Sequence, residues 1–286
     1  PESFDKAITD IVTEEVCKPF DLTKPPLFRV KLLEISQDQH LLVMNFHHII
    51  FDGWSMRNFI NELSEIYTAC GENREPVLPE LDVQYVDFSV WQRDWLTGNE
   101  GKKSLDYWKS KLSGMPPLLE LPCDLPRPKV MANKGKIFEL IIDQDLTTKL
   151  DALATDFGAT RFMLLMAAFN VLLHRWSGKT DIAVGSGVAS RPKSELETAI
   201  GFFADVWVLR SDLSNDPKFS KLLTLVKEDT LEAFTHQAVP FDVIVDAVSP
   251  ERNPAYTPVF QVMMILQNTP QADVAVSDLM FKPVIG

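Results

Sequence analysis

The sequence has little of what membrane-spanning or nucleic-acid-binding proteins need. No apolar run approaches the roughly 18 residues that a membrane-spanning helix requires. The 28 lysine and arginine residues are outnumbered by 40 aspartate and glutamate residues, which gives a net charge of −12. We find no basic stripe, the usual electrostatic footprint of a nucleic-acid-binding surface. We therefore predict that neither a membrane nor a nucleic acid is a partner of this chain.

Cysteine is also scarce, and the three cysteines, Cys17, Cys70 and Cys123, lie far apart in the sequence. None belongs to a Cys-x-x-Cys pair, a spacing typical of zinc sites and redox centres. An odd number of dispersed thiols suits a reducing compartment better than a disulfide framework. We therefore predict a cytoplasmic protein with no metal site.

Apolar residues are plentiful enough to form a substantial core, since 45% of the 286 residues are hydrophobic and 24% are charged. Their spacing alternates between short apolar runs, typical of strands, and three- or four-residue periodicity, typical of helices. The expected strands are 27–35, 41–47, 136–143, 182–188, 203–209 and 259–266. The expected helices are 4–12, 54–69, 85–96, 104–113, 146–157, 161–176 and 219–226. Because both types occur in both halves of the chain, the pattern favours an α/β sandwich.

The segment from His47 to Gly53, which reads His-His-Ile-Ile-Phe-Asp-Gly, has the clearest chemical meaning. Two histidines stand at the end of an expected strand, and adjacent strand residues point to opposite faces, which argues against joint chelation of one metal. A neutral imidazole can accept a proton near pH 7. Asp52 could contact a histidine or pair with an arginine, and the Gly53 N–H could donate to an oxyanion. The segment therefore predicts an acyl-transfer site with a histidine base.

This string resembles the active-site motif of condensation domains in nonribosomal peptide synthetases, which are related to chloramphenicol acetyltransferase. Four further segments resemble motifs of that family and follow the family's order: Tyr85–Trp91, Ile200–Val206, His236–Asp242 and Pro250–Val262. The match has departures, because Asp205 and Val206 stand where the family usually has Asn-Thr, and Ala238 stands where it has Asp. None of these departures touches the histidine motif.

The resemblance implies an α/β (α+β) sandwich of two chloramphenicol acetyltransferase-like lobes that form a V-shaped pseudo-dimer. We expect a partial N-terminal lobe at 1–115 and a partial C-terminal lobe at 136–286. A proline-rich linker at 116–135 should join them, because prolines punctuate this stretch. The family's first two motifs are missing upstream of the histidines, and the chain stops soon after the last motif. We therefore expect both lobes to be incomplete and the chain to be an internal fragment of a longer domain.

The resemblance also implies a reaction, in which an amide bond forms between a donor aminoacyl or peptidyl thioester and an acceptor aminoacyl thioester. Both would be carried on the 4'-phosphopantetheine arms of upstream and downstream peptidyl carrier proteins, with an adenylation domain adjacent in the same polypeptide and no intrinsic cofactor. His48 would act as the base or orient the amine, and Gly53 would donate to the oxyanion. Asp52 would brace the motif by an ion pair with Arg191, and His47 would support the site structurally.

Three alternatives stay open. Epimerisation domains share the histidine motif but also use a glutamate-containing motif, and no Glu-Gly-His-Gly-Arg-like run occurs in this sequence. Plant-type acyltransferases that use coenzyme A carry an Asp-Phe-Gly-Trp-Gly segment, whereas residues 156–160 read Asp-Phe-Gly-Ala-Thr. A non-catalytic condensation-like module would recruit partner proteins; such modules tend to lose the second histidine, but His48 is present.

Overall fold

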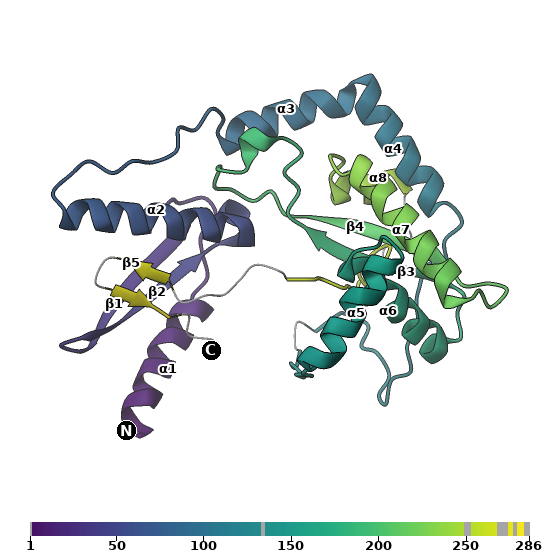
Figure 1. The fold of residues 1–286 in the computed structure, drawn as a ribbon, viewed down its shortest axis with the longest axis horizontal. Helices are drawn as coiled ribbons and strands as arrows, with labels where there is room; N and C mark the ends of the chain where they lie inside the picture. Colours follow the sequence, from purple (N-terminus) through teal and green to yellow (C-terminus); the bar gives the residue numbers. More distant parts are fainter. Residues whose placement is uncertain (1, 133–134, 249–252, 268–273, 277–278, 283–286) are drawn as a thin grey trace. The chain divides into compact units, whose positions relative to one another are not determined.

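The computed structural model divides into two compact units (Figure 1). It describes residues 2–132, 135–248, 253–267, 274–276 and 279–282. The first unit comprises Pro1–Phe88, Lys193–Phe203 and Ala272–Gly286. The second unit comprises Ser89–Pro192 and Ala204–Gln271. The two units are defined by the contacts that residues of this chain make with one another. The lobes at 1–115 and 136–286, which the family resemblance implies, stay a prediction.

The first unit is built on an antiparallel hairpin of β1 (Phe28–Ser36) and β2 (Gln39–Phe46), in register from Phe28↔Phe46 to Ser36↔Gln39. Helix α1 (Glu2–Cys17) precedes the hairpin, and a one-turn 3-10 helix η1 (His48–Ile50) and α2 (Gly53–Gly71) follow it. The remaining elements are the short strands β5 (Val274–Val276) and β6 (Leu279–Phe281) and the 3-10 turn η2 (Ser194–Leu196). The expected strands at 27–35 and 41–47 and the expected helix at 54–69 are thus confirmed.

Glu15 anchors α1 to this hairpin. Its side chain is only 4% exposed, pairs with the guanidinium of Arg29, and lies 2.6 Å from Nζ of Lys31. The Asn45 amide donates to the Glu15 carbonyl oxygen at 2.8 Å. The hydrogen bond from Lys31 to the Glu15 carboxylate holds the pKa of Glu15 below its ordinary value, and the hydrogen bond from Arg29 adds to this effect. The base of the hairpin, where the histidine motif begins, is therefore attached to a helix.

The second unit surrounds the hairpin of β3 (Asp181–Val188) and β4 (Asp205–Asp212), which pair antiparallel over their whole length. Its helices are α3 (Tyr85–Thr97, which begins in the first unit), α4 (Asn99–Leu112), α5 (Gln144–Asp156), α6 (Arg161–Ser177), α7 (Phe219–Thr235) and α8 (Phe241–Val248). Helices α6 and α7 pack against each other and on the hairpin (Figure 1). The core includes Met166, Val184 and Leu222, each at most 1% exposed.

Helix α6 is the helix that the sequence predicts at 161–176, nearly apolar all round. Six of its residues are buried, and Thr160 caps its first turn by accepting from the Met163 N–H. Among the described residues no single helix is long and apolar enough to cross a membrane, and α5 and α6 satisfy that test only together, as a pair bent by 101°. Burial of α6 in the core accounts for its apolar composition.

Two expected strands are wrong. Residues 136–143 have no regular structure, and Ile137 and Phe138 are 92% and 90% exposed. Residues 259–266 form only an isolated parallel bridge between Gly185 and Met263. In both segments the apolar pattern suits a strand, but a strand exists only where another chain segment pairs with it. Helix α8 was not predicted, because at eight residues it is too short to show clear periodicity.

Gly185 allows the chain at 260–264 to approach β3 closely. Its N–H donates to Val262 O and its carbonyl accepts from Met264 N, both at 2.9 Å. A Cβ at this position would lie 2.5 Å from the Phe260 ring. We expect Gly185→Ala to lower the free energy of unfolding by about 1–3 kcal/mol, because the ring must move. Gly187→Ala is the matched control in a urea titration, since a Cβ at position 187 would lie 3.2 Å from the flexible tip of the Ile265 side chain. Equal losses of unfolding free energy in the two variants would contradict the role of the close approach at Gly185.

Candidate active site

Contacts of both its backbone and its imidazole ring hold His47 in place. Its N–H donates to Leu27 O at 2.9 Å, directly beyond the end of β2. Its Nδ1 accepts from the Ile49 N–H at 3.0 Å and thereby caps η1, and its ring lies edge-on to Phe20 at 5.8 Å. These contacts favour a structural role for His47.

His48 is oriented differently from His47, and its ring is exposed. Its Nδ1 lies 2.7 Å from the carbonyl oxygen of Phe51. Because a carbonyl oxygen only accepts, Nδ1 carries the proton of the neutral ring and Nε2 keeps its lone pair. Within the described part of the chain, no hydrogen-bond partner occupies Nε2. His48 therefore has the tautomer and the accessibility of a base.

The expectation of an extended backbone through both histidines is wrong at His48, which begins the 3-10 turn η1. The turn is tight because Phe51 N–H donates back to His48 O at 3.4 Å. The two rings nevertheless have different neighbours, with His47 against Phe20 and His48 against Phe202 at 5.0 Å. Across the described residues, no group of three or more histidine, cysteine, aspartate or glutamate side chains could hold a metal ion.

Asp52 joins two segments that are far apart in the sequence. Its side chain is 3% exposed, and one carboxylate oxygen caps α2 by accepting from the Ser55 N–H at 2.8 Å. The other oxygen accepts from the Phe203 N–H at 3.0 Å. Asp52 therefore fixes the turn that follows His48. Arg191 follows β3 in the second unit, and its ion pair with Asp52 stays a prediction.

Gly53 is the first residue of α2 and is exposed. The N–H groups of the first helical turn have no acceptor within the helix, and the helix dipole adds partial positive charge there. No heavy atom outside its immediate neighbours lies within 4 Å of the position that a Cβ would take. The backbone N–H of Gly53 therefore belongs to this first helical turn, and its role as an oxyanion donor stays a prediction.

The segment at residues 197–203 lies against the N-terminal turns of α2. Ser55 Oγ donates to Gly201 O at 2.9 Å and accepts from Gly201 N at 3.0 Å. Trp54 Nε1 and Asn58 Nδ2 both donate to the Glu197 carbonyl oxygen, at 2.8 and 2.7 Å. The structure thus brings the Ile200–Val206 motif, up to Phe203, beside the histidine motif. Sequence reasoning missed Ser55 and Trp54, although they directly follow Asp52-Gly53.

The Tyr85–Trp91 motif meets the same segment. The Tyr85 and Phe88 rings both lie 5.0 Å from the Phe203 ring, and a Cβ on Gly201 would lie 2.5 Å from the Tyr85 ring. The His236–Asp242 motif lies in the second unit, where His236 stacks on Tyr107 at 4.1 Å and its Nδ1 is 3.0 Å from Ser104 Oγ. These contacts favour a structural role for His236. The start of the last motif, residues 250–252, is outside the described residues.

Asp205, which departs from the family's usual Asn, connects β4 to α8. One carboxylate oxygen accepts from the Val206 N–H at 2.7 Å and from the Phe241 N–H at 3.1 Å. Burial raises the pKa of this carboxyl group to about 6, and the negative charge of Asp242 contributes in the same direction, although the two N–H donors oppose both. The ionised form therefore opposes folding above pH 6.

We expect Asp205→Asn to stabilise the protein at pH 7.5 and to leave it unchanged near pH 4. Asn keeps an oxygen for both N–H donors and carries no charge. Since each pKa unit corresponds to ~1.4 kcal/mol, the gain at pH 7.5 should reach at most about 3 kcal/mol and fall as the pH drops from 6 towards 4. Urea titrations at several pH values measure it.

Asp212 at the other end of β4 is the matched control for Asp205. A hydrogen bond from the Ser214 N–H lowers its pKa, so its carboxylate stabilises the fold above its unfolded pKa and loses that contribution as the pH falls. Asp212→Asn should therefore lower stability at pH 7.5. A gain for Asp205→Asn that is independent of pH would contradict the role assigned to its charge.

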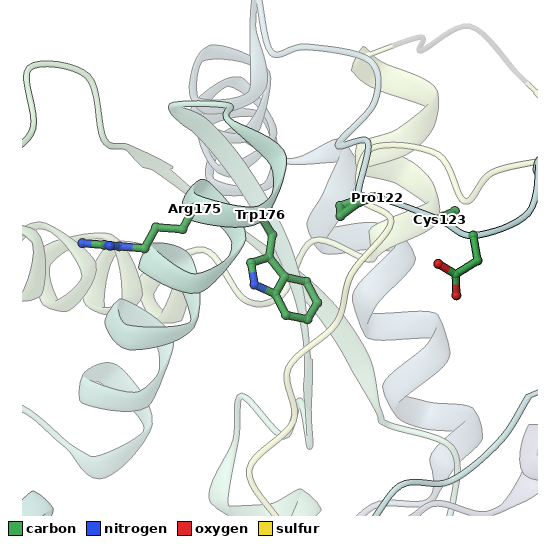
Figure 2. A pocket seen from close by; sticks show the side chains of 5 residues that line it. Pro122, Cys123, Arg175 and Trp176 are labelled. Carbon is green, nitrogen blue, oxygen red and sulfur yellow. The ribbon is translucent and has the colours of Figure 1, made fainter.

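A pocket in the second unit contains none of the motif residues. Pro122, Cys123, Asp124, Arg175 and Trp176 line it, and its volume is about 520 Å³. Figure 2 shows the side chains of this pocket. Its side chains come from the proline-rich stretch and from the last turn of α6. The candidate active site therefore rests on the histidine motif, not on this pocket.

Comparisons with known proteins agree with these motifs. Residues 2–282 match the family described as Condensation domain. A linear gramicidin synthase from Brevibacillus parabrevis is 44% identical over 273 residues, which are 96% of this chain but only 4% of that relative. The chain is thus a small part of the length of such a relative.

Two solved structures show the same fold. The X-domain from teicoplanin biosynthesis, in a complex with OxyB, superposes with a TM-score of 0.82 and 28% identity over 90% of this chain and 58% of that chain. A four-domain nonribosomal peptide synthetase bound to AMP and glycine superposes with a TM-score of 0.80 and 25% identity over 95% of this chain and 21% of that one. The expected α/β fold of the chloramphenicol acetyltransferase type is confirmed.

Proposed function

Because this chain belongs to the condensation-domain family of nonribosomal peptide synthetases, we propose that it forms amide bonds between two carrier-bound thioesters. The observation that carries the proposal is the state of His48. Its Nδ1–H is committed to Phe51 O at 2.7 Å, which leaves Nε2 as an exposed base at the end of β2. The residues around it, Asp52 and the first turn of α2, are held by buried hydrogen bonds.

The proposed reaction begins with attack of the acceptor amine on the donor thioester carbonyl. As the C–N bond forms, the nitrogen becomes acidic and its proton moves to Nε2 of His48. The carbonyl oxygen becomes an oxyanion, which the Gly53 N–H and the positive end of α2 stabilise. The C–S bond then breaks, and the leaving thiolate takes the proton from His48. A neutral amine is already nucleophilic, so positioning by His48 contributes alongside proton transfer.

The partners follow from the substrates. We propose that upstream and downstream carrier proteins present the two thioesters on phosphopantetheine arms, and that an adenylation domain loads the acceptor carrier. The linear gramicidin synthase that this chain matches is far longer, and the chain spans 4% of it, which supports a setting with many domains. The residues proposed for catalysis are His48, Asp52 and Gly53, with His47 and Arg191 in support, and the proposed location is the cytoplasm.

A reconstituted condensation assay tests the proposal. Two carrier proteins loaded with different aminoacyl groups are mixed with the protein, and intact mass spectrometry follows each carrier. We expect the acceptor carrier to gain the mass of the donor acyl group while the donor carrier returns to the free thiol. Deuterium uptake at the α-carbon without any transfer would instead indicate epimerisation. Two unchanged carriers would contradict both activities.

Recruitment of another protein is the second candidate. The observation that favours it is the similarity to a teicoplanin X-domain, which was solved in a complex with OxyB. A recruitment module has no need of a basic nitrogen, so the accessible Nε2 of His48 favours catalysis. The transfer assay and a calorimetric binding measurement together separate the two, because recruitment predicts that a carrier binds in calorimetry while the assay shows no acyl transfer.

A further inference from the structure

The backbone on both sides of Phe202 is held by buried groups. Gly201, directly before it, exchanges two hydrogen bonds with the Ser55 hydroxyl, whose side chain is fully buried. Phe203, directly after it, donates its N–H to Asp52 at 3.0 Å and is 3% exposed. Phe202 itself is 36% exposed. Its side chain is therefore presented at the surface from a fixed backbone.

The Phe202 ring meets the ring of His48. Their centroids are 5.0 Å apart and their planes are inclined by 79°, the edge-to-face arrangement that aromatic pairs prefer. On the other side, His48 Nδ1 is held by the Phe51 carbonyl, and the Phe51 ring is fixed by stacking on Phe46 at 4.2 Å. The imidazole of His48 thus has a polar restraint at one nitrogen and an aromatic restraint from Phe202.

We propose that Phe202 is a positioning residue that holds the His48 imidazole in the orientation that presents Nε2 to the reacting amine. This inference rests on the proposed function. An exposed histidine with a single hydrogen bond can exchange rotamers, and each exchange moves Nε2 away from the reaction. The aromatic contact lowers the population of those rotamers.

Kinetics of Phe202→Leu in the carrier-based assay provide the first test. Leucine keeps the site apolar but removes the ring edge, so kcat should fall roughly 3- to 10-fold, the range that an aromatic pair accounts for, with KM little changed. Phe202→Tyr keeps the ring and should restore kcat. Phe28→Leu is the matched control, because Phe28 is also an exposed aromatic residue of the first unit, but it stacks on Phe46 instead of His48. Its kcat should equal that of the wild type.

A second readout does not depend on amide formation. Long-range ¹⁵N–¹H spectra of histidine-labelled protein report the tautomer of His48, whose signals are assigned by their loss in His48→Gln. We expect the wild type and Phe202→Tyr to show the Nδ1–H tautomer, and Phe202→Leu to show an averaged mixture. An averaged mixture in Phe202→Leu alone supports the positioning role even if no amide is ever detected, in which case only the proposed function fails. Unchanged spectra or an unchanged kcat in Phe202→Leu would overturn the inference.

Discussion

His48→Ala should reduce the rate of amide formation roughly 100- to 10,000-fold, the range in which general-base catalysis contributes. The substitution removes the only nitrogen of the motif with a free lone pair, because Nδ1 of His47 already accepts from the Ile49 N–H. The fold should survive, since the His48 ring is exposed and its one hydrogen bond is to Phe51 O. Single-turnover transfer between loaded carriers measures the loss directly.

His40→Ala is the matched control for the loss of an imidazole. His40 is exposed on β2, six residues before the strand ends, and pairs with Glu34 across the hairpin. This variant should keep the wild-type rate. A loss below tenfold in His48→Ala would show that the imidazole orients the amine without accepting its proton, since positioning then carries the rate.

The parts of the site that have local signals could be predicted from the sequence. An apolar run predicts β2, the polar residues around it predict its ends, and helical periodicity predicts α2. Asp52 stands three residues before the N–H that it caps, which is an ordinary helix-start pattern. The separation of the two histidine rings also followed from the sequence, although a 3-10 turn at His48, and not an extended strand, produces it.

The contacts that complete the site could not be predicted in this way. The two hydrogen bonds between Ser55 and Gly201 join residues 146 positions apart, and such pairs leave no periodic trace in a single sequence. The contact between Phe202 and His48 has the same origin. The strand expected at 136–143 failed for a related reason, because β-branched and apolar residues favour a strand but do not supply its partner.

Asp52→Asn should destabilise the protein more than any other conservative substitution of an aspartate at a helix start. The buried carboxylate accepts from two backbone N–H groups, of Ser55 and Phe203. Asn has one oxygen, so its amide group must face one of these N–H groups, and a buried donor left unpaired costs ~1–3 kcal/mol. If Arg191 also loses its counter-charge, the loss should rise to ~3–5 kcal/mol. Urea unfolding measures the change, and the yield of folded protein should fall with it.

Asp143→Asn supplies the matched control, because Asp143 caps α5 by the same 2.8 Å bond to the third N–H of the helix but is exposed. Asn and Asp are equal as exposed caps, so this variant should change stability by less than about 0.5 kcal/mol. Combining Asp52→Asn with Arg191→Gln then tests the predicted ion pair. If the ion pair exists, the double variant should lose less unfolding free energy than the sum of the losses of the two single variants, by about 1 kcal/mol or more. Additive losses would contradict the pair with Arg191, and the stability of the motif turn would then rest on the hydrogen bonds of Asp52 alone.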